Sequence, residues 1–463
     1  MYPRISKKQR LIRLILTYSL MFLSVFVLVG VVLLIVLGYR LDDKNGLERG
    51  ALLQFNTRPT GATVSVDGKD LFGATPTKTT VLSGAHDVQM TLKGYRAWSK
   101  HISVQSGTLT WLDYALLIPT NLTTESVKAY GASAQSLISS DGKTIVTLPD
   151  PKVTSLDVTD IANTTPVTKT IPLPEGLSSS TDHNLSLLRI TGDGNFALLQ
   201  DNSEYIVVKL SDANQSVNLT RLFNVAFSRL EFLGNNGDDM YGLVDGALRF
   251  VNISSTKISD PLISGINSFR IVSDDTIAYF TTDTIGLYQR GADAPIIVRQ
   301  VPAGTAVNFA VDQYHSDSYL AISVGNVVDI YKDSIPRSDN DVKSLKKVIS
   351  IIMENPITSL DFSPRGQYLL AQDGTSFSTY DIELAKSYLN AKGTAHWLNE
   401  ANLYSTDDGD LTLREFDGTN YNQLGKATAG SLAALASNNQ FIYSFGTTAG
   451  GTQVQRISLK ASN

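Results

Sequence analysis

The chain has 463 residues, of which 39 are basic and 44 acidic, and it has no cysteine. The lack of cysteine excludes disulfides, thiolate metal ligands and a cysteine nucleophile. Five basic residues precede residue 14, which leaves 34 basic against 44 acidic residues from Arg40 onward, a formal charge of −10. Nucleic acid is bound by clustered lysine and arginine side chains, so we expect no nucleic-acid partner.

Residues 1–13 are basic, and residues 14–37 form a run of 24 positions without a charge. At about 1.5 Å per helical residue, the run reaches roughly 36 Å, enough to cross a hydrocarbon core of about 30 Å. We predict a cytoplasmic tail over residues 1–13 and a transmembrane signal anchor over residues 14–39, with lipid contact through residues 14–37. Because the cations lie on the N-terminal side only, the positive-inside rule places the rest of the chain outside the plasma membrane.

Two other interpretations of this segment compete with an anchor. A cleaved signal peptide has an apolar stretch of about 7 to 15 residues and a small-residue cleavage site. The uncharged run is longer than that, and Val36–Arg40 offers no such site. A core helix of a soluble protein normally keeps a polar face, which this run lacks. Exported domains without disulfides are more typical of bacterial or archaeal surfaces than of eukaryotic ones.

Residues 50–118 predict a small β-sandwich. Leu52–Asn56 and Ala62–Val66 alternate in polarity and are separated by a turn sequence, and Asp67-Gly68 supplies a tight turn after the second of them. No helical periodicity occurs in this region. Four more strands are expected at Thr79–Leu82, His86–Leu92, Trp98–Val104 and Thr110–Leu117.

Five turn motifs follow one another in this region, at Arg58–Val64, Val66–Gly68, Gly73–Pro76, Gly84–Val88 and Gly94–Trp98. In order and spacing they resemble the PEGA domain, although Thr60 departs from the name-giving motif. The resemblance implies an extracellular β-sandwich similar to surface-layer modules, without known catalytic residues. The rings of Tyr95 and Trp98 are predicted to lie in the core and not to form a ligand platform.

Residues 123–460 repeat a unit of strand, Asp/Gly/Asn turn and strand, which predicts a β-propeller. The clearest copies are Leu137–Leu148, Leu188–Leu199 and Leu360–Ala371. We count eight units and keep seven as the alternative, because the units at residues 314 and 399 are faint. The weaker turns lie at Asn235–Asp239, Ser273–Thr276, Tyr314–Ser318, Asn399–Asn402 and Ser437–Gln440.

The ends of the repeat array predict how the ring closes. The last unit has three strands, and Thr123–Tyr130 belongs to no unit of its own, so this segment is expected to supply the missing outer strand. The run Ser363–Tyr368 resembles TolB-like and WD-repeat propellers. The predicted fold is therefore all-β with one N-terminal transmembrane helix, a PEGA-like β-sandwich and an eight-bladed (alternatively seven-bladed) β-propeller.

Motifs for catalysis or cofactor binding are missing from the sequence. The five histidines are dispersed, and the chain has no HExxH, GxSxG, GxGxxG or phosphate-binding loop. Acidic turns such as Asp141-Gly142 and Asp193-Gly194 are ordinary hairpin turns and not strong calcium sites. We therefore name no catalytic, cofactor-binding or metal-binding residue and expect no cofactor. Asp339–Lys347 is expected to be an extended loop between strands.

Three hypotheses of function follow. The first is a non-enzymatic surface protein whose propeller binds an envelope component, either cell-wall glycan or a protein partner. The second is a propeller hydrolase or lyase acting on polysaccharide, for which two carboxyl groups about 5 to 10 Å apart in a central pocket would argue. The third is a structural spacer or envelope-assembly factor, which a flat propeller mouth would favour.

Overall fold

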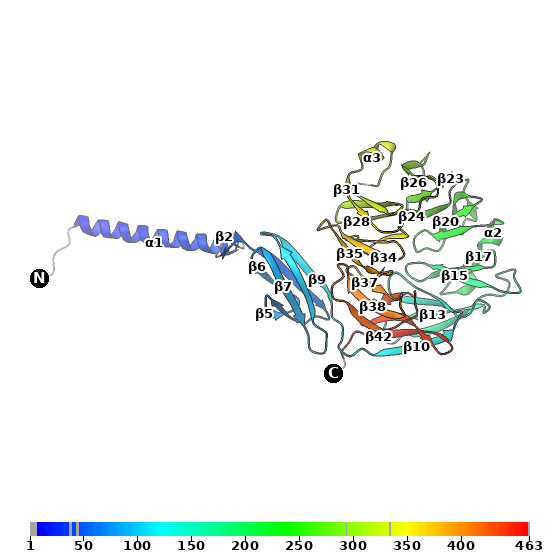
Figure 1. Cartoon of the computed structure of the whole chain (residues 1–463), viewed down its shortest axis with the longest axis horizontal. Helices are drawn as coiled ribbons and strands as arrows, with labels where there is room; N and C mark the ends of the chain where they lie inside the picture. Colours follow the sequence, from blue (N-terminus) through cyan, green and yellow to red (C-terminus); the bar gives the residue numbers. More distant parts are fainter. Residues whose placement is uncertain (1–6, 37–38, 43–45, 293, 333–334, 462–463) are drawn as a thin grey trace. The chain divides into compact units, whose positions relative to one another are not determined.

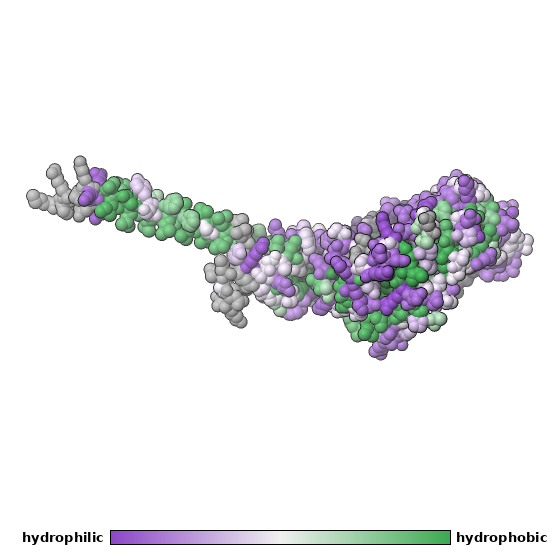
Figure 2. All heavy atoms as spheres, turned by 90° about the horizontal axis from the view of Figure 1, so that it is seen from above, coloured by the Kyte–Doolittle hydropathy of each residue, from purple (hydrophilic) through white to green (hydrophobic). Residues whose placement is uncertain are grey.

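The computed structural model describes residues 7–36, 39–42, 46–292, 294–332 and 335–461, and the chain divides into two compact units at residue 120 (Figure 1). Helix α1 (Lys7–Val36) includes a segment, Arg10–Leu34, that is long and apolar enough to cross a membrane. The large apolar side chains from Leu11 to Leu33 are exposed, and Figure 2 shows hydrophobic surface along the helix. Residues 1–6 of the predicted tail and residues 37–38 of the predicted anchor lie outside the described residues.

A short antiparallel hairpin follows the helix, formed by β1 (Tyr39–Asp42) and β2 (Gly46–Arg49). The sequence did not lead us to expect it. The next strands form a sandwich of two sheets, with strand orders β6-β3-β9 and β5-β4-β7-β8. Their bounds are β3 (Ala51–Arg58), β4 (Thr63–Val66), β5 (Lys69–Ala74), β6 (Thr77–Val81), β7 (Gly84–Thr91), β8 (Trp98–Val104) and β9 (Leu109–Leu116).

The six strands predicted for the sandwich are all present, and β5 is an additional one. The turn between β4 and β5 has positive φ at both Asp67 (50°) and Gly68 (75°), as a type I′ hairpin requires. Trp98 is 2% exposed and belongs to the sandwich core, and Tyr95 packs against that core, as predicted. Strand β5 escaped prediction because it is an edge strand with little burial, and Phe72 on it is fully exposed.

An ion pair on the sandwich makes its stability depend on pH. His86 Nδ1 lies 2.7 Å from Asp67 Oδ2, and His86 Nε2 lies 2.9 Å from the Leu82 carbonyl, so both nitrogens donate only when the ring is charged. Burial lowers the pKa of His86, but the bonds to Asp67 and Leu82 outweigh it, and the net pKa is above 6.5. Hydrogen bonds from His86 and from the Asp87 N–H lower the pKa of Asp67.

We predict that the sandwich loses stability as the pH rises through the raised pKa of His86. The folded state binds the proton more tightly than the unfolded chain, so the contribution is complete below pH 6.5 and disappears above the folded pKa. Thermal unfolding measured from pH 5.5 to 9 checks this slope. His86→Ala should remove the slope and His101→Ala, at an exposed position, should keep it; an unchanged slope in His86→Ala would contradict the assignment.

The second unit is a β-propeller, built from eight successive sheets within the described residues. We number them 1 to 8 in chain order. Sheet 1 contains β11 (Gln135–Ile138), β12 (Thr144–Leu148), β13 (Ser155–Asp160) and β14 (Val167–Pro172), and sheet 2 contains β15 (Leu185–Ile190), β16 (Phe196–Asp201), β17 (Glu204–Lys209) and β18 (Val217–Asn218). Sheet 3 contains β19 (Arg229–Phe232), β20 (Asp239–Val244), β21 (Ala247–Asn252), β22 (Lys257–Ile258) and β23 (Ile263–Ser264). Sheet 4 contains β24 (Ser268–Ser273), β25 (Thr276–Phe280), β26 (Thr284–Gln289) and β27 (Ile296–Gln300).

The remaining four sheets have the same antiparallel order. Sheet 5 contains β28 (Val307–Tyr314), β29 (Asp317–Val324), β30 (Val327–Lys332) and β31 (Lys347–Ile352), and sheet 6 contains β32 (Ser359–Phe362), β33 (Tyr368–Gln372), β34 (Ser376–Asp381) and β35 (Lys386–Lys392). Sheet 7 contains β36 (His396–Trp397), β37 (Asn402–Ser405), β38 (Asp410–Glu415) and β39 (Asn422–Lys426). Sheet 8 contains β40 (Ala433–Leu435), β41 (Phe441–Thr448), β42 (Gly451–Ser458) and β10 (Thr124–Gly131).

Each of the eight turns found in the sequence joins the first and second strands of one sheet. The ring closes as predicted: β10, at the start of the unit, pairs with β42 as the outer strand of sheet 8, from Thr124 opposite Ile457 to Gly131 opposite Gly451 (Figure 1). Apolar clusters join neighbouring sheets, and one of them joins sheet 8 to sheet 1 through Tyr443 and Ile145. The sheets are therefore held in a ring by hydrophobic packing between their faces.

The helices of the propeller are short: η1 (Ala213–Gln215), α2 (Leu219–Phe223) and α3 (Asp339–Ser344). Asp339–Lys347 lies between two strands, β30 and β31, as predicted, but it is not an extended loop, because it holds α3 and the first residue of β31. Ser338 caps the helix by accepting a hydrogen bond from the Asp341 N–H, and two acidic residues lie in its first turn. The Ser-x-x-Asp pattern was a helix-start signal in the sequence.

Candidate functional site

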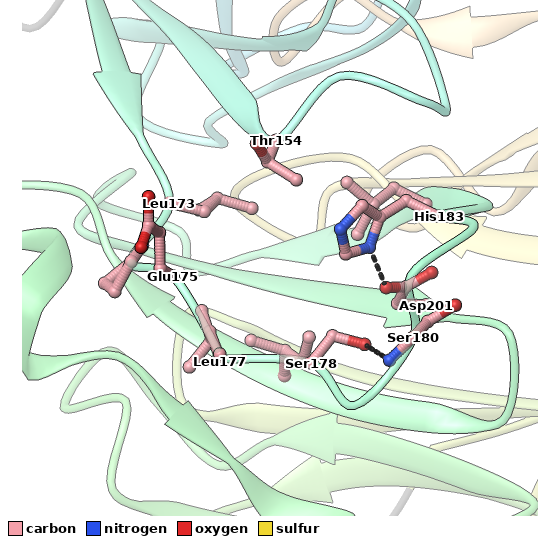
Figure 3. Close-up of a pocket in the computed structure, with 12 residues that line it drawn as sticks. Thr154, Leu173, Glu175, Leu177, Ser178, Ser180, His183 and Asp201 are labelled. Atoms are coloured by element: carbon pink, nitrogen blue, oxygen red, sulfur yellow. Dashed lines mark hydrogen bonds and ion pairs between the residues drawn. The ribbon is translucent and has the colours of Figure 1, made fainter.

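The antiparallel strand order gives the propeller two different faces. One face carries the turns between first and second strands of each sheet, and the other carries the second-to-third turns and the connections between sheets. A cavity of about 190 Å³ lies on the second face, between sheets 1 and 2 (Figure 3). It is lined by Thr154, Leu173, Pro174, Glu175, Gly176, Leu177, Ser178, Ser180, His183, Leu185, Asp201 and Ile206.

The connection between β14 and β15, residues 173–184, forms much of the cavity wall. Glu204, at the start of β17, anchors it by accepting hydrogen bonds from the Ser178 hydroxyl (2.9 Å), the Ser179 N–H (2.8 Å) and the Ser179 hydroxyl (2.7 Å). Asn218 donates to both Glu204 and the Leu177 carbonyl. Burial opposes ionisation, but these bonds lower the pKa of Glu204, so a charged carboxylate holds the connection in place.

His183 and Asp201 form the most polar part of the cavity. His183 Nδ1 lies 2.6 Å from Asp201 Oδ2, and the Asn184 N–H donates to Asp201 Oδ1 at 2.9 Å. The Asp201 side chain is fully buried; burial opposes its ionisation, but hydrogen bonds from His183 and Asn184 lower its pKa. A carboxylate only accepts, so Nδ1 carries a proton and Nε2 is the nitrogen left for other contacts (Figure 3).

The two serines of the cavity are not arranged as nucleophiles. The Ser178 hydroxyl donates to Glu204, and the Ser180 hydroxyl donates to the Asp182 carbonyl at 2.7 Å. A serine nucleophile gives its proton to the histidine base, and here both hydroxyl protons are directed elsewhere. Within the described part of the chain, His183 Nε2 has no hydrogen-bond partner, so it is available to a ligand.

The His183–Asp201 pair is one copy of a contact that recurs around the ring. In each copy an aspartate at the second-to-third turn of a sheet accepts a hydrogen bond from a residue just before the first strand of that sheet, and we call this contact the acid clamp. The acid clamps are Ser133 to Asp150 in sheet 1, His183 to Asp201 in sheet 2, Asn355 to Asp373 in sheet 6 and Thr394 to Asp407 in sheet 7.

The clamp has a structural purpose in every copy. It ties the incoming connection to the turn beside it. Asp201 and Asp373 are buried, and several donors at once stabilise each of these charges. Sheet 2 differs because its donor is an imidazole, whose second nitrogen remains free at a cavity. The arrangement thus offers one hydrogen-bond acceptor, nearby hydroxyls and apolar walls to a small polar ligand.

On the opposite face, the acidic residues of the turns accept hydrogen bonds from within their own turns. Asp141 accepts from the Ser139 hydroxyl and the Lys143 N–H, and Asp193 accepts from the Thr191 hydroxyl and the Asn195 N–H. In the described residues, no group of three or more histidine, aspartate or glutamate side chains is placed to hold a metal ion.

The sequence led us to no site residue, and the cavity residues were missed. His183 was noted only as one of five dispersed histidines. A signal did exist: β15 and β16 form a hairpin with Leu185 opposite Asp201, so a histidine two residues before the hairpin lies beside an aspartate at its far end. Recognising it would have required the strand register, which the sequence alone left open.

Comparison with known proteins identifies the first β unit. Residues 51–118 match the PEGA domain family, so the chain carries a PEGA domain. No curated protein shows a significant match to the chain.

Solved structures similar to this chain include β-propellers. The C-terminal WD40 domain of Sif2 shows 10% identity and a TM-score of 0.49, covering 72% of this chain and 98% of its own. An oligogalacturonate lyase from Vibrio parahaemolyticus shows 11% identity and a TM-score of 0.40, covering 71% and 98%. A chain of the yeast Nup82-Nup159-Nup116 nucleoporin complex shows 9% identity and a TM-score of 0.40, covering 64% and 97%. These similarities concern the fold and assign no activity.

Proposed function

We propose that this protein is a single-pass plasma-membrane protein that acts, without catalysis, as a binding or scaffold module for an envelope component, either cell-wall glycan or a protein partner. The candidate span Arg10–Leu34 and the basic residues before it support an anchor with the PEGA domain and propeller outside the cell. The formal charge of −10 from Arg40 onward fits a hydrated exterior surface.

The observation that carries this proposal is the repetition of the acid clamp. A catalytic histidine–aspartate pair is expected once in a molecule, whereas the contact made by His183 and Asp201 has counterparts in sheets 1, 6 and 7 that contain no histidine. The pair therefore belongs to the scaffold that holds the face rigid. A rigid face with a small cavity suits recognition, since little conformational entropy is lost when a ligand binds.

Retention of envelope material tests the proposal. The full-length protein in detergent, and a soluble form starting at residue 46, are immobilised and exposed to solubilised envelope fractions and to polysaccharide. We expect both forms to retain the same envelope component and neither to release reducing ends or unsaturated sugars. Failure to retain any component, together with hydrolase or lyase activity, would reject the proposal in favour of a polysaccharide-acting enzyme.

Two substitutions separate a clamp from a catalytic pair. Asp201→Ala removes a buried acceptor of three donors and should lower the free energy of unfolding of the propeller by about 2–3 kcal/mol. His183→Asn keeps a donor of the kind that Asn355 provides in sheet 6, so its cost should stay below about 1 kcal/mol. Urea denaturation of both variants measures these changes. Unchanged stability in Asp201→Ala would contradict the clamp.

A further inference from the structure

The outer face of the PEGA sheet β6-β3-β9 presents its side chains as a regular grid. Gln54 on β3 lies opposite Lys78 on β6 and opposite Trp111 on β9. Because side chains two apart on a strand share a face, Asn56 and Asp113 continue this surface in the next row. A hollow of about 440 Å³ lies over it, lined by Gln54, Phe55, Asn56, Pro76, Thr77, Lys78, Trp111 and Asp113.

Trp111 is the centre of this surface. Its neighbour Leu112 points into the sandwich core and is 2% exposed, whereas Trp111 is 50% exposed on the opposite side of the same strand. The other tryptophan of the domain, Trp98, is 2% exposed. An indole left half in water keeps a large apolar area whose burial by a ligand is favourable.

Polar side chains with unused hydrogen-bonding groups border the indole. Among the residues described, the side chains of Gln54, Lys78 and Asp113 form no hydrogen bond or ion pair. The side-chain carbonyl of Asn56 accepts from the Thr57 N–H at 2.9 Å, which leaves its two amide hydrogens free. The surface therefore combines one flat ring with amide, ammonium and carboxylate groups that can both donate and accept.

We propose that this surface, which we call the Trp111 platform, is a subsite for an uncharged sugar ring of an envelope glycan. A pyranose has an apolar face of C–H groups and a rim of hydroxyls, so the C–H face can lie on the indole while the hydroxyls reach Gln54, Asn56, Lys78 and Asp113. The lysine and aspartate cancel in charge, which favours a neutral sugar over a uronic acid. The inference rests on the proposed function and makes it more specific.

A protein partner fits the platform less well. Stable protein interfaces bury about 800 Å² on each side around several apolar anchors. The exposed apolar side chains on this face are those of Trp111 and Leu109, with Leu52 half-buried beside them. A single ring enclosed by polar groups matches the size of one or two sugars better than that of a folded partner.

The test uses the full-length protein in detergent with two neutral probes, cellotetraose and chitotetraose, and one acidic probe, a galacturonate tetramer. We expect saturable binding of a neutral probe, seen by titration calorimetry and as a change in tryptophan fluorescence. Trp111→Ala should weaken that binding at least about 10-fold. Phe72→Ala, which removes an exposed aromatic ring from the other sheet of the domain, is the matched control and should bind as the unmodified protein does.

Three results would overturn the platform: no binding of either neutral probe, equal binding by Trp111→Ala, or stronger binding of the acidic probe. Loss of an envelope protein, and not of sugar, in Trp111→Ala would also overturn it in favour of a protein interface. These results are distinct from failure of the proposed function. Trp111→Ala could still retain an envelope component through the propeller, and total loss of retention by the unmodified protein would reject both.

Discussion

Replacing Gly366 with alanine is expected to lower the free energy of unfolding of the propeller by about 3 kcal/mol. Gly366 has φ of +75°, and a Cβ atom there would lie 2.4 Å from the Gln313 backbone carbonyl oxygen in sheet 5. The left-handed conformation costs alanine about 1–2 kcal/mol, and overpacking against backbone adds about 1–3 kcal/mol. Urea denaturation followed by circular dichroism measures the loss.

Gly246→Ala is the matched control for this prediction. Gly246 also lies in a hairpin turn of the propeller, with φ of +71°, but its added Cβ would meet no atom within 4 Å. The strain of positive φ then acts alone, and the expected loss is about 1 kcal/mol. Equal losses of stability in Gly366→Ala and Gly246→Ala would contradict the prediction. They would show that the packing of the sheet 6 turn against Gln313 of sheet 5 does not require glycine at position 366.

Deletion of β10, residues 124–131, is expected to destabilise the propeller by about 5 kcal/mol or more, comparable with the whole stability of an ordinary domain. The strand pairs with β42 along its length, and Lys128 on it lies 2.6 Å from the buried Asp157 of sheet 1. Removing it exposes the edge of β42 and invites pairing with other chains. Thermal unfolding and light scattering measure both effects.

A milder change in the same strand serves as the comparison. Glu125→Gln breaks the 2.6 Å ion pair with Arg456, in which Glu125 is 55% exposed, so the loss should be below about 1 kcal/mol. A deletion no more harmful than this substitution would mean that sheet 8 is stable with three strands, and that the ring does not need β10.

Much of the fold could be predicted from the sequence because its signals are local. An uncharged run predicts a helix, and turns rich in aspartate, glycine and asparagine mark where strands reverse. Even the closing strand β10 was predictable, because Thr123–Tyr130 had strand character and no unit of its own. The strand β5 and the helix α3 were missed because one is an exposed edge and the other is a single capped turn within a charged segment.

Neither candidate site could be predicted in the same way. The cavity needs His183 and Asp201 to be opposed across a hairpin, and the Trp111 platform needs Gln54 to lie between residues that are distant in sequence. The parallel pairing of β3 with β9 is a long-range contact, and nothing in the local pattern around Trp111 marks it as outward-facing in that register.

The closing strand also determines how the protein carries mechanical load. The chain that leaves the PEGA domain becomes β10 within a few residues, so any pull between helix α1 and the propeller passes through this strand. Tension therefore enters the ring at its seam, where β10 meets β42. We expect such a pull to load first the pairing of β10 with β42, together with the ion pair between Lys128 and Asp157 of sheet 1.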